Sequence, residues 1–145
     1  MNTNMQNGPG TDTKTQSLRK MVNLAAGKLR LTAVNRHSFI INEVSPEFQI
    51  KTNEIILTSL LTELLSAVVS NMNDGCIRIE ATEYDDVIFV TVKDKSNNIV
   101  KGTVAPNFDA LKTLARRMNG AISVNNTEYK INSILLSFPN FKVAA

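Results

Sequence analysis

The sequence is poor in cysteine, histidine, tryptophan, proline and glycine. It contains one cysteine, one histidine, no tryptophan, four prolines and six glycines. A single cysteine, Cys76, excludes an internal disulfide, and one cysteine with one histidine gives no pattern typical of a zinc site. We therefore expect a chain that folds without cross-links, as suits the reducing cytoplasm.

Long apolar runs are scarce as well. No stretch reaches the roughly 18 residues that a membrane-spanning helix needs, and the polar N-terminus lacks the apolar segment of a signal peptide. The chain has 145 residues, 43% of them hydrophobic and 20% charged, which is typical of one globular domain. The sequence therefore predicts a cytoplasmic protein without membrane contact.

Acidic residues are nearly missing from the first 36 positions. This part carries six lysines or arginines and one acid, Asp12, whereas residues 37–145 carry ten basic and twelve acidic groups. Such a bias can mark contact with nucleic acid or an acidic partner. Because no aromatic residue is present there to stack on bases, we interpret the bias as a solvated helix face and expect no nucleic-acid binding.

Apolar periodicity predicts the order of helices and strands. Helices are expected at about 15–26, 53–72 and 108–119, the first ended by Gly27 and the last capped by Asn107 and ended by Gly120. Strands are expected at 36–44, 47–51, 77–82, 87–92, 121–124 and 129–138, with Ser45-Pro46 turning between the first two.

This order predicts an α+β fold, a two-layer sandwich in which a mixed β-sheet carries the helices on one face. We expect a disordered tail at 1–14, an N-terminal helix and connector at 15–35, and the main domain at 36–145.

Polar residues form a seam on the long predicted helix. Ser59, Glu63, Ser66 and Ser70 follow at spacings of four, three and four, which places them on one helical face. The strand 87–92 ends in a polar segment that contains Asp94. We expect the carboxylates of Glu63 and Asp94 to face one shared cleft.

These local sequences resemble the ATPase domain of the GHKL superfamily, which includes histidine kinases, gyrase-type topoisomerases, large heat-shock chaperones and MutL repair proteins. The resemblance covers roughly residues 36–139 and rests on four pieces in the family order. These are Leu57–Ala67, Val92–Asn98, Asn119–Val124 and Leu135–Pro139. It implies a histidine kinase-like ATPase fold, ATP and Mg²⁺ as ligands, and a role in signal transduction of the bacterial two-component type.

The resemblance assigns roles on the long helix in two alternative registers. In the family, an Asn on this helix binds Mg²⁺, and a Glu or Asn one turn earlier orients the nucleophile. One register puts Glu63 first and leaves Ala67 at the metal position, and the other puts Ser59 first and Glu63 at the metal position. Neither supplies the usual Asn.

The segment that follows Asp94 departs further from the family. Asp94 matches the residue that accepts a hydrogen bond from the adenine amino group, but Ser96 and Asn98 stand where the family has glycines. The expected lid is only residues 99–107, in which Lys101 and Thr103 are candidates for phosphate contact or simply solvated side chains.

His37 and Cys76 have simpler interpretations than catalysis. His37 opens a predicted strand, whereas the phosphorylated histidine of histidine kinases lies on a helix of a separate dimerisation domain. Cys76 begins an apolar strand, which favours a buried structural thiol.

Three functions remain open. The first is a degenerate histidine-kinase-type domain, a pseudokinase that works through contacts with a signalling protein and binds ATP weakly or not at all. The second is a functional ATP-binding histidine kinase or anti-sigma-type serine kinase domain, and the third is an unrelated α/β binding module. We expect a signalling protein as the partner, and the sequence also allows a homodimer.

Overall fold

The computed structural model describes residues 15–70, 72–94, 108–126 and 131–140. The strands are β1 (Thr15–Ser17), β2 (Phe39–Asn42), β3 (Gln49–Lys51), β4 (Cys76–Tyr84), β5 (Val87–Asp94), β6 (Ala121–Asn126) and β7 (Ile131–Pro139). The helices are α1 (Leu18–Lys28), α2 (Arg30–Asn35), α3 (Glu54–Val69) and α4 (Asp109–Arg117). The expected disordered tail at 1–14 lies outside the described residues.

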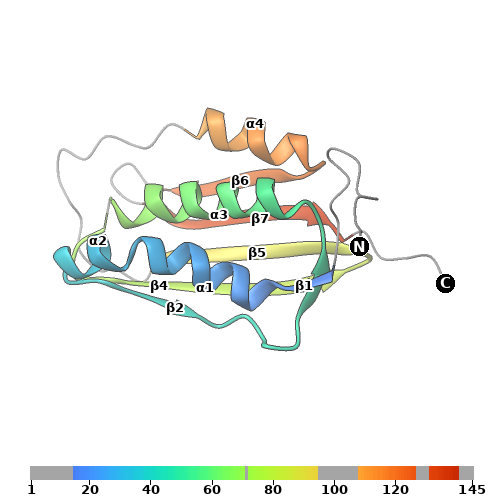
Figure 1. The fold of residues 1–145 in the computed structure, drawn as a ribbon. Helices are drawn as coiled ribbons and strands as arrows, with labels where there is room; N and C mark the ends of the chain where they lie inside the picture. Colours follow the sequence, from blue (N-terminus) through green and yellow to red (C-terminus); the bar gives the residue numbers. More distant parts are fainter. Residues whose placement is uncertain (1–14, 71, 95–107, 127–130, 141–145) are drawn as a thin grey trace, which may run out of the picture.

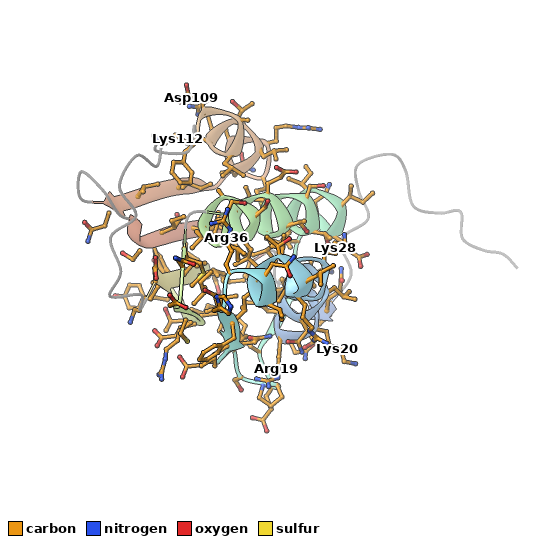
Figure 2. All side chains as sticks on the ribbon, turned by 90° about the vertical axis from the view of Figure 1, so that its left-hand side faces the viewer. Arg19, Lys20, Lys28, Arg36, Asp109 and Lys112 are labelled. Atoms are coloured by element: carbon orange, nitrogen blue, oxygen red, sulfur yellow. The ribbon has the colours of Figure 1, made fainter. Side chains whose placement is uncertain are left out.

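Five strands form one mixed sheet in the order β2-β4-β5-β7-β6. β2 runs parallel to β4, and the other neighbouring strands are antiparallel. Helices α1, α3 and α4 lie side by side (Figure 1), and the turned view in Figure 2 places them on the same face of the sheet. The predicted α+β sandwich with helices on one face is therefore confirmed.

Helix α3 supplies the centre of the core. The side chain of Asn53 caps it by accepting a hydrogen bond from the backbone N–H of Ile56 at 3.0 Å. Burying one Leu or Val side chain contributes roughly 1.5–3 kcal/mol, so α3 holds the two layers together. The buried residues of α3 are Leu57, Leu60, Leu61, Leu64, Leu65, Val68 and Val69.

Among the described residues, no helix is long and apolar enough to cross a membrane.

Strands β4 and β5 are antiparallel neighbours and correspond to the strands predicted at 77–82 and 87–92. The turn is shorter than expected, since only Asp85 and Asp86 lie between the strands, with φ of 53° and 61°. Two central residues with positive φ match the type I′ turns that suit the twist of a hairpin. Alternate residues of β5 face the core, namely Ile88, Val90 and Val92, and β5 is the middle strand of the sheet.

The predicted helix at 15–26 is wrong at both ends. Thr15–Ser17 pair with β3 instead, and the side chain of Ser17 caps α1 by accepting from the backbone N–H of Lys20 at 3.3 Å. Gly27 does not end the helix. Helix α1 continues to Lys28 and α2 follows, because the buried side chains of Leu29 and Ala33 extend the core-facing surface beyond the glycine.

The two strands expected on either side of Ser45-Pro46 do not pair with each other. β2 joins the large sheet beside β4, whereas β3 forms a separate two-stranded sheet with β1. The Arg19 guanidinium donates to the carbonyl oxygens of Asn42 at 3.2 Å and Val44 at 2.7 Å. These bonds occupy acceptors that a hairpin partner would need, so the chain leaves the sheet after β2.

The start of α4 differs from the prediction, whereas the residue that ends the helix does not. Its N-cap position is Phe108, without a side-chain cap, rather than Asn107, which lies outside the described residues. The predicted stop is confirmed, since the N–H of Gly120 donates to the carbonyl of Ala115 at 2.8 Å and Asn119 adopts a φ of 59°.

Replacing Gly120 with alanine is expected to lower the free energy of unfolding by about 1–3 kcal/mol. A Cβ at this position would collide with the backbone oxygen of Ser137 in β7. Gly27→Ala is the matched control, because nothing lies within 4 Å of its added Cβ and alanine favours a helix by about 0.5–1 kcal/mol over glycine. Urea unfolding measures both effects, and equal values would contradict the tight contact at Gly120.

Candidate functional site

The polar seam of α3 faces solvent. Ser59, Glu63 and Ser70 are exposed and Ser66 is half-buried, while the opposite face of the helix is buried against the core. Within the described part of the chain, the Glu63 carboxylate has no hydrogen bond or ion pair. It is therefore available to a ligand or to solvent without breaking an internal contact.

Asp94 lies at the end of a central strand. It is half-buried, it is the last residue of β5, and it is aligned with Ile77 near the start of β4. Figure 1 shows the end of β5, the C-terminal end of α3 and the first turn of α4 at the same end of the molecule. The topology thus brings Asp94 to the end of the sheet that α3 approaches. A cleft shared by the carboxylates of Asp94 and Glu63 stays a prediction.

Four of the predicted nucleotide-site residues lie outside the described residues. These are Ser96, Asn98, Lys101 and Thr103. The short lid expected at residues 99–107 lies there too, so the described part of the site consists of α3 and the end of β5.

The residues on α3 do not fit a Mg²⁺ site of the family kind. α3 contains no Asn, and the resemblance predicts half-buried Ala67 or exposed Glu63 at the metal position, depending on the register. Within the described ranges, no group of three His, Cys, Asp or Glu side chains could hold a metal ion. The adenine-contacting role of Asp94 stays a prediction, as does the assignment of Ser59, Glu63 and Ala67 on α3.

His37 lies in the turn between α2 and β2. Its φ is 53°, its side chain is 79% exposed, and its Nδ1 atom is 3.7 Å from Oδ1 of Asp74. Cys76 begins β4 opposite Phe39 and is half-buried, less than predicted. The expectation that His37 opens a strand is wrong, because Arg36 and His37 form a turn and β2 begins at Phe39.

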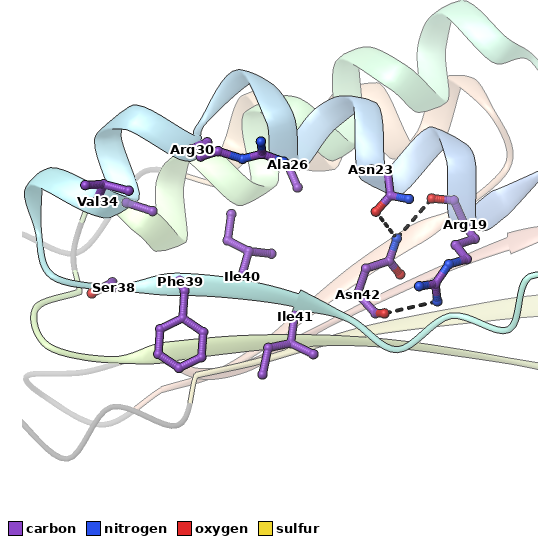
Figure 3. Close-up of a pocket in the computed structure, with 11 residues that line it drawn as sticks. Arg19, Asn23, Ala26, Arg30, Val34, Ser38, Phe39, Ile40, Ile41 and Asn42 are labelled. Atoms are coloured by element: carbon purple, nitrogen blue, oxygen red, sulfur yellow. Dashed lines mark hydrogen bonds between the residues drawn. The ribbon is translucent and has the colours of Figure 1, made fainter.

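A groove along β2 is a feature that the sequence analysis missed. It has a volume of about 750 Å³, within the range typical of ligand sites. The whole segment Ser38–Asn42 lines one side, and α1 and α2 line the other with Arg19 and Arg30, as Figure 3 shows. The sequence signal that points to it is the scarcity of acidic residues before Glu43.

The fold is similar to that of solved histidine kinases. The nucleotide-free catalytic domain of histidine kinase ThkA matches with a TM-score of 0.69 and 12% identity, covering 89% of this chain and 97% of that chain. Acinetobacter baumannii histidine kinase AdeS matches with a TM-score of 0.74 and 9% identity, covering 90% and 68%. Full-length ShkA in complex with AMPPNP matches with 0.73 and 17%, covering 92% of this chain and 32% of that chain.

ThkA has also been solved in complex with the response regulator protein TrrA, and that structure matches with a TM-score of 0.70 and 12% identity, covering 88% of this chain and 42% of that chain. No protein-family model and no curated protein sequence matches this chain. At such low identity the structural likeness establishes the fold, and the expected histidine kinase-like ATPase fold is confirmed.

Removing the polar groups of the seam is expected to leave folding nearly unchanged. Ser59→Ala and Glu63→Ala should each change the free energy of unfolding by less than about 0.5 kcal/mol, because both side chains are exposed. Leu64→Ala, in the next position but fully buried, should cost about 2–5 kcal/mol. Thermal and urea unfolding test the contrast, and a large loss in Glu63→Ala would mean that Glu63 supports the fold.

Proposed function

We propose that this chain is a degenerate histidine-kinase-type ATP-binding domain that acts in signal transduction mainly through protein contacts. It binds ATP weakly or not at all, and it works in the cytoplasm. The proposal combines the fold, which is that of histidine kinase catalytic domains, with a site in which the metal-binding part has been replaced.

The observation that carries the proposal is the composition of α3. Phosphoryl transfer depends on neutralising the charge of the phosphates, to which Mg²⁺ contributes much. A methyl group at Ala67 cannot bind a metal ion. If Glu63 takes the metal position instead, Ser59 occupies the position of the residue that orients the nucleophile. In either register, one residue that phosphoryl transfer needs is missing. We therefore expect at most weak ATP binding, without phosphoryl transfer.

A signalling partner is the natural counterpart of such a domain. The similar ThkA structure contains a response regulator, which supports a protein partner for a domain of this fold. Partner binding needs a folded surface and no metal ion. A domain that has lost its metal ligand can therefore keep this part of its role.

An active kinase is the second candidate. It is favoured by the retained Asp94 at the end of β5 and by the exposed Glu63 on α3. If Glu63 coordinates Mg²⁺ or orients a hydroxyl nucleophile, the domain would act as a histidine kinase or as an anti-sigma-type serine kinase.

We expect no useful phosphate release or autophosphorylation with Mg²⁺-ATP. Loss of one electrostatic contact to a transition state commonly costs about 3 kcal/mol, or roughly a hundredfold in rate. The measurement is phosphate release and radiolabel transfer by the full chain, with Glu63→Ala as the comparison. Both proteins should give the same background rate. Turnover that disappears in Glu63→Ala would establish the kinase and reject the degenerate function.

Restoring the missing ligand should strengthen Mg²⁺-dependent nucleotide binding. Ala67→Asn places an amide oxygen at the family metal position if Glu63 precedes it, and calorimetry should then show ATP binding at least about tenfold tighter with Mg²⁺ than without. Glu63→Asn is the control for the other register, because it places the amide at position 63 and leaves Ala67 unchanged. A gain in Glu63→Asn alone would assign the second register, and equal binding by both variants and the original chain would remove α3 from the site.

A further inference from the structure

Strand β2 is an edge strand with backbone groups that face outward. The N–H of Phe39 donates to the carbonyl of Gly75 at 3.2 Å, and the N–H of Glu43 donates to that of Ile79 at 2.8 Å. Backbone groups alternate in direction along a strand, so the odd-numbered residues of β2 bond to β4. The N–H and C=O of Ile40 and the N–H of Asn42 therefore point to the open edge, along which the groove runs.

One end of this edge is already closed by side chains. Besides the two bonds from Arg19, the Asn42 amide donates to Asn23 Oδ1 at 2.8 Å and to the Arg19 carbonyl at 3.0 Å. These contacts protect the C-terminal end of β2, as side chains often do at exposed edges. Ile40 has no such cover among the described residues. Figure 3 shows its side chain pointing toward Ala26 and Arg30, away from Phe39 and Ile41.

The groove is positively charged and apolar at once. Ala26, Ala33, Val34 and Ile40 contribute apolar surface, and Arg30 is exposed. Among the residues that the structure describes, no acidic side chain lines the groove. The nearest acid along the chain, Glu43, is paired with Arg78 at 3.3 Å.

Nearby charges add to the positive field of the groove. Lys20 and Lys28 are exposed on α1, the helix that borders it, as the turned view in Figure 2 shows. Within the described part of the chain, neither lysine nor Arg19 or Arg30 has a carboxylate within 4.0 Å. The charge at this edge is thus not neutralised internally.

We infer that the β2 groove binds an extended acidic segment of a partner protein, which adds a strand beside Ile40 and places a carboxylate on Arg30. Main-chain hydrogen bonds give such strand addition its affinity, and side-chain pockets give it specificity. The apolar surface around Ile40 accepts one apolar side chain of the segment. The inference goes beyond the proposed function, because the groove involves neither α3 nor β5. Binding of the segment in the groove therefore does not depend on ATP binding.

Charge decides between an acidic partner and a second copy of this chain. A symmetric pairing of two β2 edges would bring the same surface together from both copies and face arginines with arginines. Like charges placed across an interface cost several kcal/mol, whereas an acidic segment gains charge-assisted hydrogen bonds. The acidic segment is therefore the occupant that the surface favours.

The test uses the full chain and three labelled nine-residue peptides. In the acidic peptide, Val and Thr alternate with Glu. The basic peptide has Lys in place of each Glu, and the third peptide is the acidic one with a Pro at its central position. The acidic peptide should bind, weaken as salt rises, and slow amide exchange at Ile40 and Asn42. Arg30→Glu should weaken binding at least about tenfold, and Lys28→Glu, a like change outside the groove lining, by less than about threefold.

Circular dichroism of both variants is the control for folding. Arg30→Glu should preserve the fold, because an acidic residue is favourable in the first turn of a helix.

Three outcomes would contradict the inference. Equal binding of the acidic, basic and proline-containing peptides would reject strand addition. Equal effects of Arg30→Glu and Lys28→Glu would reject Arg30 as the contact. Self-association that protects Ile40 and Asn42 would assign the edge to a second copy.

Discussion

Burial of α3 against the five-stranded sheet is the constraint on which the rest of the structure depends. Seven of its sixteen residues are buried, so its rotation about its own axis is fixed. That rotation decides which residues remain accessible, and it leaves Ser59 and Glu63 in solvent. Helix α3 also lies between α1 and α4. Both helices contact α3, and each also contacts the sheet, α1 at β2 and α4 at β6.

The parts of the fold that depend on local pattern could be predicted from the sequence. The 3.6-residue apolar period of α3 and the alternation in β4 and β5 are set by neighbouring residues, so the helix, the hairpin and the layer arrangement follow from them. The pairing of β1 with β3 joins residues 15–17 to 49–51, and the parallel partner of β2 lies beyond α3. No local sequence pattern identifies these strand partners, because the pairing depends on contacts between side chains that are far apart in the sequence.

The candidate sites divide in the same way. Glu63 and Asp94 could be found by their position within an element, a helix face and a strand end. The β2 groove could not, because it exists only after Arg19 reaches across from α1 to carbonyls 23 and 25 residues away. The basic N-terminal segment was visible in the sequence, but whether its charges surround an apolar groove or an unbroken solvated face depends on how α1, α2 and β2 meet.

The proposed nucleotide site and the β2 groove lie on different elements, so one can change while the fold and the other persist. Stability comes from the buried face of α3, whereas Ser59 and Glu63, which we propose as nucleotide positions, lie on its exposed side. Substitutions at exposed positions usually change stability by less than about 0.5 kcal/mol, so Ser59 and Glu63 can be replaced without unfolding the domain. The groove is held instead by Arg19, Asn23 and Asn42, and none of their hydrogen bonds involves α3. A domain of this fold can therefore vary at the exposed positions of α3 and still keep the edge formed by β2.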